Sequence, residues 1–124
     1  MARLHDIVFD CAHPASLARF WADVLDDHEI APYDEDELER LRGMGITDTE
    51  DDPSVLLDGS PRIFFNLVPE AKTVKNRVHV DLRSPHPEAE AKRLFDLGAT
   101  LVSRDGDWFV LADPEGNEFC LSAE

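Results

Sequence analysis

Apolar and polar residues alternate over residues 3–11, which predicts a half-buried strand at the start of the chain. Ile7 and Phe9 fall on one face of that strand, and Asp6 falls on the other. Pro14 then stands where a helix tolerates its missing N–H, and apolar residues recur at helical spacing after it. The chain is therefore predicted to begin with a strand followed by a helix.

Shorter apolar runs complete the first half of the chain. We predict a short strand over residues 28–31, an acidic helix over 34–42 ended by glycine, and a hairpin of strands over 54–57 and 62–68. The Asp-Gly-Ser-Pro segment at residues 58–61 has the composition of a turn. The first half is thus predicted to follow the order β-α-β-β-β.

The second half shows the same order of patterns. Residues 78–83 alternate like a strand, and a His-Pro pair at residues 86–87 opens a helix that ends at Gly98. Three more strands are predicted, over residues 99–103, 108–112 and 118–122. The last two are joined by Asp-Pro-Glu-Gly-Asn, which has proline and glycine where a turn uses them.

A comparison of the two halves indicates an internal repeat. A shift of 73 residues places Asp6 on His79 and His13 on His86, and a shift of 54 places Phe65 on Phe119. Because these matches fall where elements begin or end, duplication is the simpler explanation. We predict one α+β domain over residues 1–124, with a first module over about 1–69, a connector over 70–76 and a second module over 77–124.

The strand faces predict where a binding site would lie. One face of each curved antiparallel sheet would pack on its helix, and the other faces of the two sheets would enclose a cup. The helix-facing residues are then Ile7, Phe9, Phe65, Leu67, Val80, Leu82, Phe119 and Leu121. The cup-facing residues are Asp6, Val8, Asp10, Phe64, Asn66, Val68, His79, Asp81, Arg83, Glu118, Cys120 and Ser122. A sheet with one wetted face explains the same alternation, and the repeat favours the cup.

Composition limits the partners and the location of the protein. The formal net charge of −15 disfavours nucleic acid and anionic membranes as partners. No apolar run is long enough to span a membrane and no export signal is recognised, so we expect a cytoplasmic protein in which Cys11 and Cys120 are free thiols. Fourteen acidic residues lie from Asp23 to Asp58, a region that we interpret as solvated surface.

Three segments resemble a known family. HPASLARFWADVLD (residues 13–26), FFNLVPEAKTVKNRVHVDL (64–82) and LADPEGNEFCL (111–121) are similar to the glyoxalase-like group of the vicinal oxygen chelate superfamily, which includes bleomycin-resistance proteins and dioxygenases. The resemblance covers nearly the whole chain. It implies an eight-stranded antiparallel cup of paired βαβββ modules with the helices outside, and a homodimer.

The resemblance also implies where a divalent metal would bind. Metal-binding members carry ligands on the first and last strands of each module, and the matching positions here are Asp6, Asn66, His79 and Cys120. His79 fits the usual pattern of His or Gln, Glu, His and Glu, and Asp6 is chemically suitable, whereas Asn66 and Cys120 depart from it. The cofactor is therefore left open between no metal and a divalent metal at Asp6 and His79, with zinc compatible with a Cys120 thiolate.

His79 and Asp6 are the candidate catalytic pair, because an imidazole titrates near neutrality and carboxylates tune it. Further candidates for ligand binding are Asp10, Phe64, Asn66, Asp81, Arg83, Trp108, Glu118 and Cys120. Each has a structural alternative, such as hydrogen bonding for His79, ion pairing for Arg83 and packing for the aromatic rings and the thiol.

Three functions are compatible with these residues. The first is a glyoxalase-like lyase or isomerase that acts on a small oxygenated or cationic metabolite. The second is a metal-free protein that sequesters a ligand or antibiotic, as bleomycin-resistance proteins do. The third is a subunit-interaction domain whose cup is filled by side chains. Stoichiometric metal would favour the first function, and ligand-dependent stabilisation without turnover would favour the second.

Overall fold

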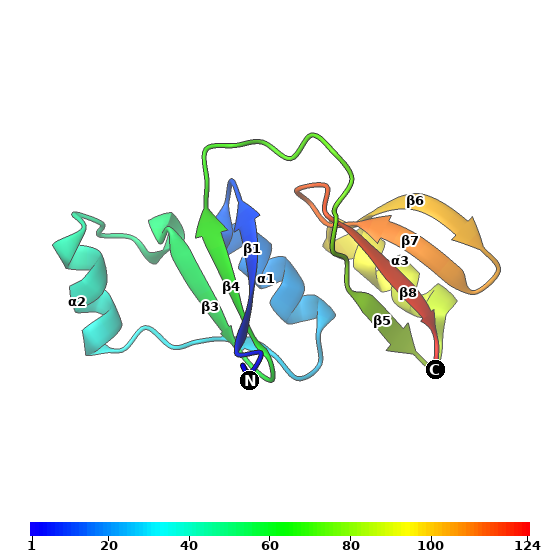
Figure 1. The fold of residues 1–124 in the computed structure, drawn as a ribbon, viewed down its shortest axis with the longest axis horizontal. Helices are drawn as coiled ribbons and strands as arrows, with labels where there is room; N and C mark the ends of the chain where they lie inside the picture. The colour runs from blue at the N-terminus through cyan, green and yellow to red at the C-terminus, as the bar shows by residue number, and fades with distance from the viewer. The chain divides into compact units, whose positions relative to one another are not determined.

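The computed structural model describes residues 1–124 as two units, Met1–Ala71 and Lys72–Glu124. Figure 1 shows that each unit combines a β-sheet with a helix lying along one of its faces. The boundary between the units falls inside the connector that we predict over residues 70–76.

Unit one contains the elements that the first half of the sequence predicts. They are β1 (Asp6–Cys11), α1 (Pro14–Val24), β2 (Glu29–Ile30), α2 (Glu35–Gly43), the 3₁₀ helix η1 (Thr49–Asp51), β3 (Ser54–Asp58) and β4 (Arg62–Leu67). The strands form one sheet in the order β1-β4-β3-β2, in which β1 lies parallel to β4 and the other pairs are antiparallel. The short helix η1 has no counterpart in the sequence prediction.

Unit two repeats this arrangement. Its elements are β5 (Asp81–Ser84), α3 (Pro87–Leu97), β6 (Thr100–Asp105), β7 (Trp108–Ala112) and β8 (Glu118–Ala123), with the strand order β5-β8-β7-β6. The predicted α+β class and the two βαβββ modules are confirmed. Each sheet is mixed, because its first strand lies parallel to its last. The cup concerns the arrangement of both sheets and stays a prediction.

The strand predicted over residues 78–83 begins later, at Asp81. Its partner β8 begins at Glu118, and the backbone N–H of Cys120 donates to the carbonyl of Val80 at 3.0 Å. Residues before Val80 therefore have no partner strand beside them. His79 lies in extended chain just ahead of the sheet.

The two main helices begin in the same way. His13 precedes α1 with φ −135° and ψ 79°, and His86 precedes α3 with φ −132° and ψ 74°. In both cases Pro occupies a first-turn position, where its missing N–H leaves no bond unmade. The shift of 73 residues thus superposes both helices over their whole length.

The core of unit one lies between the sheet and α1. The Phe9 ring is 5.4 Å from the Trp21 ring and 5.1 Å from the Phe65 ring, as the predicted faces require. Leu67 is a correction to that prediction, because it is 54% exposed. It ends β4, beyond the part of the sheet that α1 covers, so its parity alone does not bury it.

The strand registers revise one part of the repeat. Phe65 pairs with Phe9 and Val55, while Leu121 pairs with Leu82 and Phe109. These neighbours are related by shifts of 73 and 54, so β4 matches β8 with a shift of 56. The sequence shift of 54 is two short because the β7–β8 turn, residues 113–117, is two residues longer than the β3–β4 turn, residues 59–61.

Candidate functional site

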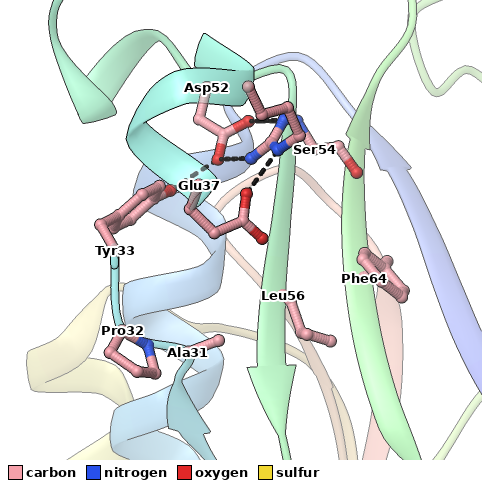
Figure 2. Close-up of a pocket in the computed structure, with 9 residues that line it drawn as sticks. Ala31, Pro32, Tyr33, Glu37, Asp52, Ser54, Leu56 and Phe64 are labelled. Atoms are coloured by element: carbon pink, nitrogen blue, oxygen red, sulfur yellow. Dashed lines mark hydrogen bonds and ion pairs between the residues drawn. The ribbon is translucent and has the colours of Figure 1, made fainter. Parts of the chain in front are cut away.

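A cavity of about 350 Å³ lies in unit one, on the face of the sheet opposite α1. Its lining residues are Ala31, Pro32, Tyr33, Glu37, Arg40, Asp52, Ser54, Leu56 and Phe64. Figure 2 shows Leu56 and Phe64 on the strands and Asp52, Glu37 and Tyr33 gathered at one end. We call this cavity the α2 pocket, because Glu37 and Arg40 of α2 form one of its walls. Phe64 is a predicted ligand-binding residue, and the pocket includes it.

The polar wall of the α2 pocket is built around the buried carboxylate of Asp52. The Tyr33 hydroxyl donates to Asp52 Oδ2 at 2.6 Å, and Arg40 Nη2 donates to the same oxygen at 3.0 Å. The backbone N–H of Ser54 donates to Oδ1 at 2.9 Å. These bonds compensate for taking a carboxylate that is only 1% exposed out of water.

The same network fixes the charge state of its donors. Burial and the adjacent Asp52 carboxylate raise the pKa of Tyr33 far above its ordinary value, so its hydroxyl keeps its proton. Hydrogen bonds to Asp52 and then Glu37 raise the pKa of Arg40 further. The pocket therefore carries two carboxylates against one guanidinium. Glu37 Oε2 accepts from Arg40 Nε at 2.5 Å, and Glu37 Oε1 stays available to a ligand.

Sequence reasoning missed Tyr33, Arg40 and Asp52, because all three lie in the acidic region interpreted as solvated surface. That interpretation is wrong for Asp52, which is buried, and for Leu41, which is 2% exposed. A usable signal was present: Asp52 directly precedes Pro53 and the apolar run of β3, where a side chain is carried to the edge of the sheet.

A larger cavity of about 580 Å³ opens beside the start of α1. It is lined by Ala12, His13, Pro14, Ala15, Ser16, Glu50, Asp51, Asp52 and Leu67. Its side chains are mostly small or acidic, so it offers a ligand less apolar contact than the α2 pocket does.

The two predicted ligand positions of unit one already have protein partners. Asp6 accepts hydrogen bonds from Arg62 Nε at 2.8 Å and Nη2 at 3.2 Å, which hold the pKa of its carboxyl below its ordinary value. Asn66 Oδ1 accepts from the Ser54 hydroxyl at 2.7 Å. These side chains do not fit the four-ligand pattern that the family resemblance implies. The catalytic role predicted for Asp6 stays a prediction.

Unit two brings together three of the predicted site residues. The donor atoms of His79, Asp81 and Cys120 all lie within 4.8 Å of one another, and His79 Nε2 is 3.2 Å from Asp81 Oδ1. Cys120 is buried, while the other two side chains are exposed. Burial, and then the charge of Asp81, raise the pKa of the Cys120 thiol, whereas a hydrogen bond with Trp108 lowers it.

The remaining predicted site residues fall into two groups. Glu118 accepts from Lys72 Nζ at 2.6 Å and from the Asn76 N–H at 2.8 Å, so it pins the connector segment to β8 and its pKa is lowered. Asp10 and Arg83 lie exposed on β1 and β5. Their predicted roles in ligand binding stay predictions.

No helix of this chain has the length and apolar character needed to cross a bilayer.

Comparisons with known proteins agree with this architecture. Residues 6–122 match the family model described as a glyoxalase-like domain. No curated protein matches the chain. The fold is similar to that of a glyoxalase/bleomycin resistance/dioxygenase family enzyme from Burkholderia phytofirmans, with 18% identity, a TM-score of 0.65 and 98% of each chain covered.

Two fosfomycin resistance proteins have similar folds. FosX from Mesorhizobium loti is 15% identical with a TM-score of 0.69, and covers 98% of this chain and 91% of its own. An E126Q mutant of FosX from Listeria monocytogenes, complexed with Mn(II) and 1S,2S-dihydroxypropylphosphonic acid, is 12% identical with a TM-score of 0.68 and covers 99% and 93%. At these identities the likeness extends to the fold.

Proposed function

Because the chain belongs to the glyoxalase-like domain family, we propose that it binds a small organic molecule and that the α2 pocket is the binding site. The observation that carries the proposal is the composition of this pocket. Leu56 and Phe64 form an apolar wall opposite a fixed polar wall made by Tyr33, Arg40 and Asp52. A concave apolar surface with a few oriented polar groups is typical of small-molecule sites.

The charges of the pocket define the class of ligand. Asp52 is saturated by its three donors, whereas Glu37 has one oxygen left to accept a hydrogen bond. The ligand is therefore a small molecule with an apolar or aromatic body and a cationic or hydrogen-bonding group. Its body packs on Leu56 and Phe64, and its polar group meets Glu37.

Three probes with one common body test this proposal. They are phenethylamine, which is a cation, 2-phenylethanol, which is neutral, and phenylacetate, which is an anion. Calorimetry and thermal unfolding are measured on protein treated with a chelator, so that binding is scored without metal. We expect the affinity order cation, neutral, anion, and a stabilisation of about 2.7 kcal/mol at a ligand concentration 100 times Kd. Equal affinity for all three probes would contradict the role of Glu37.

Matched variants place the site. Phe64→Ala removes the aromatic wall and is expected to weaken phenethylamine binding by about tenfold or more, since burial of a Phe side chain contributes about 1.5–3 kcal/mol. Glu37→Gln is expected to remove the preference for the cation. The controls are Phe95→Ala on α3 and Glu39→Gln, whose carboxylate faces Arg42. Binding lost equally in the controls would show that the probes bind elsewhere.

A lyase or isomerase activity is the second candidate. The observation that favours it is the group formed by His79, Asp81 and Cys120, in which the imidazole Nε2 lies 3.2 Å from a carboxylate oxygen. That geometry suits a histidine that accepts a proton from a bound substrate. Turnover lost in His79→Ala and kept in His86→Ala would support this function over simple binding.

Location and assembly are also proposed on family membership. We propose a cytoplasmic homodimer, as the resemblance implies. Sedimentation equilibrium of the purified chain over a range of concentrations tests the dimer, and a monomer at all concentrations would exclude it.

A further inference from the structure

We propose that His79, Asp81 and Cys120 form a three-donor site for zinc within unit two, made of one imidazole, one carboxylate and one thiolate. Asp6 and Asn66, the unit-one positions of the family resemblance, take no part in it. The proposal goes beyond ligand binding in the α2 pocket, because it concerns other residues and is tested without any organic ligand.

The distances between the donor atoms suit zinc. Bonds of about 2.0–2.3 Å at tetrahedral angles place donor atoms about 3.3–3.6 Å from one another. His79 Nε2 and Asp81 Oδ1 are 3.2 Å apart, and the whole group lies within 4.8 Å. Small side-chain rotations therefore complete the geometry without moving the strands.

The backbone explains why these residues meet. Asp81 and Cys120 are directly paired between the parallel strands β5 and β8, so their side chains lie next to each other on one face. His79 is two residues before Asp81 and shares its side of the chain. Because β8 is an inner strand of the sheet, Cys120 has a fixed position, while His79 is held less tightly just ahead of β5.

The donor types select the metal. Thiolate and imidazole ligands suit zinc and other borderline transition metals, whereas Mg²⁺ and Ca²⁺ prefer oxygen ligands alone. Three protein ligands leave a fourth position open, as in catalytic zinc sites. Metal binding would release the thiol proton of Cys120, so zinc uptake is accompanied by proton release.

The side chains around the group separate it from the family pattern. Asp6, the unit-one position that the repeat matches to His79, is held by two hydrogen bonds from Arg62. By strand register, Val8 and Phe64 correspond to Asp81 and Cys120, and neither carries a metal donor. The same three-donor group therefore exists in one module alone.

Metal titration of the full-length protein tests the proposal. We expect one Zn²⁺ per chain by calorimetry, no measurable binding of Mg²⁺, and a thiolate-to-metal charge-transfer band when Co²⁺ is added. Cys120→Ser, Asp81→Asn and His79→Ala are each expected to weaken Zn²⁺ binding by more than about tenfold. Circular dichroism of each variant checks that it is folded, and the Co²⁺ band of the unsubstituted protein tests the thiolate without any variant.

Three controls make the assignment specific. Cys11→Ser removes the other buried thiol, Asp10→Asn removes an exposed strand carboxylate, and Asp6→Asn removes the unit-one position. Zinc affinity is expected to be unchanged in all three. An absent Co²⁺ charge-transfer band, or a loss in Asp6→Asn as large as that in Asp81→Asn, would overturn the proposal.

Discussion

Arg62 clamps the carboxylate of Asp6 across the pair of strands β1 and β4, with hydrogen bonds of 2.8 and 3.2 Å to its two oxygens. Asp6 and Arg62 are also register partners in the parallel ladder, so the clamp belongs to the sheet itself. The position that the family resemblance assigns to a metal ligand is thus occupied by an ion pair within one sheet. This pair gives the first prediction.

The stability contributed by Asp6 is expected to depend on pH. Arg62, and to a smaller extent His5, lower the pKa of Asp6 below 3.8 in the folded chain. A lowered folded pKa gives stability that is present above the unfolded value and is lost as pH falls through the folded value. Urea unfolding should therefore show a smaller difference between the unsubstituted protein and Asp6→Asn at pH 2.5 than at pH 7. An Arg62→Met background should abolish this pH dependence.

Asp52 is expected to be the most sensitive acidic residue of unit one. Asp52→Ala removes the partner of Tyr33, Arg40 and the Ser54 N–H together, and should lower the free energy of unfolding by about 3 kcal/mol. Its exposed neighbour provides the control, since Asp51→Ala should change stability by about 0.5 kcal/mol or less. Urea unfolding measures both, and similar losses would contradict the buried network.

Gly59 is expected to resist substitution because of the ring beside it. A Cβ at this position would lie 2.2 Å from His28 Cδ2, so Gly59→Ala should destabilise the chain by about 1–3 kcal/mol. Gly43→Ala meets nothing within 4 Å and should be neutral or stabilising by up to about 1 kcal/mol. In a double-mutant cycle, His28→Ala should recover part of the Gly59→Ala loss. Strictly additive effects would argue against this contact.

His28 is expected to stabilise the fold as a cation. Its Nδ1 lies 2.8 Å from Asp27 Oδ1 and its Nε2 lies 2.8 Å from the Pro61 carbonyl oxygen. Both partners are acceptors, so both ring nitrogens must donate. Burial opposes the charge, but the bonds to Pro61 and Asp27 outweigh it and raise the pKa of His28 above 6.5.

The sign of this effect is opposite to that for Asp6. A raised folded pKa gives stability that is complete below the unfolded value and is lost as pH rises through the folded value. The difference in unfolding free energy between the unsubstituted protein and His28→Gln should therefore be larger at pH 5.5 than at pH 9. Asp27→Asn should reduce that difference, and a titration of the His28 ring by NMR reports its pKa directly.

The fold could be predicted from sequence because its signals are local. The His-Pro pairs mark the starts of α1 and α3, and alternation marks most strands within two residues. The late start of β5 could not be predicted, since it depends on where β8 offers a partner. The exposure of Leu67 likewise depends on how far α1 reaches along the sheet, which alternation does not encode.

The candidate site could be predicted in part for the same reason. Parity placed His79, Asp81 and Cys120 on one face, and the structure brings them together. The polar wall of the α2 pocket was missed because Tyr33, Arg40 and Asp52 come from three separate segments. Composition describes such a region by its average charge, whereas one buried carboxylate depends on which donors the fold delivers to it.

The turn between β7 and β8 is two residues longer than its counterpart, and this even difference bears on how the duplicated halves diverged. An odd insertion would have turned every later side chain of β8 to the opposite face of its sheet. An insertion of two preserves inside and outside but gives each position a new neighbour, so that Cys120 now stands beside Asp81. A single even-numbered change in a loop can thus assemble a new group of reactive side chains while every strand keeps its orientation.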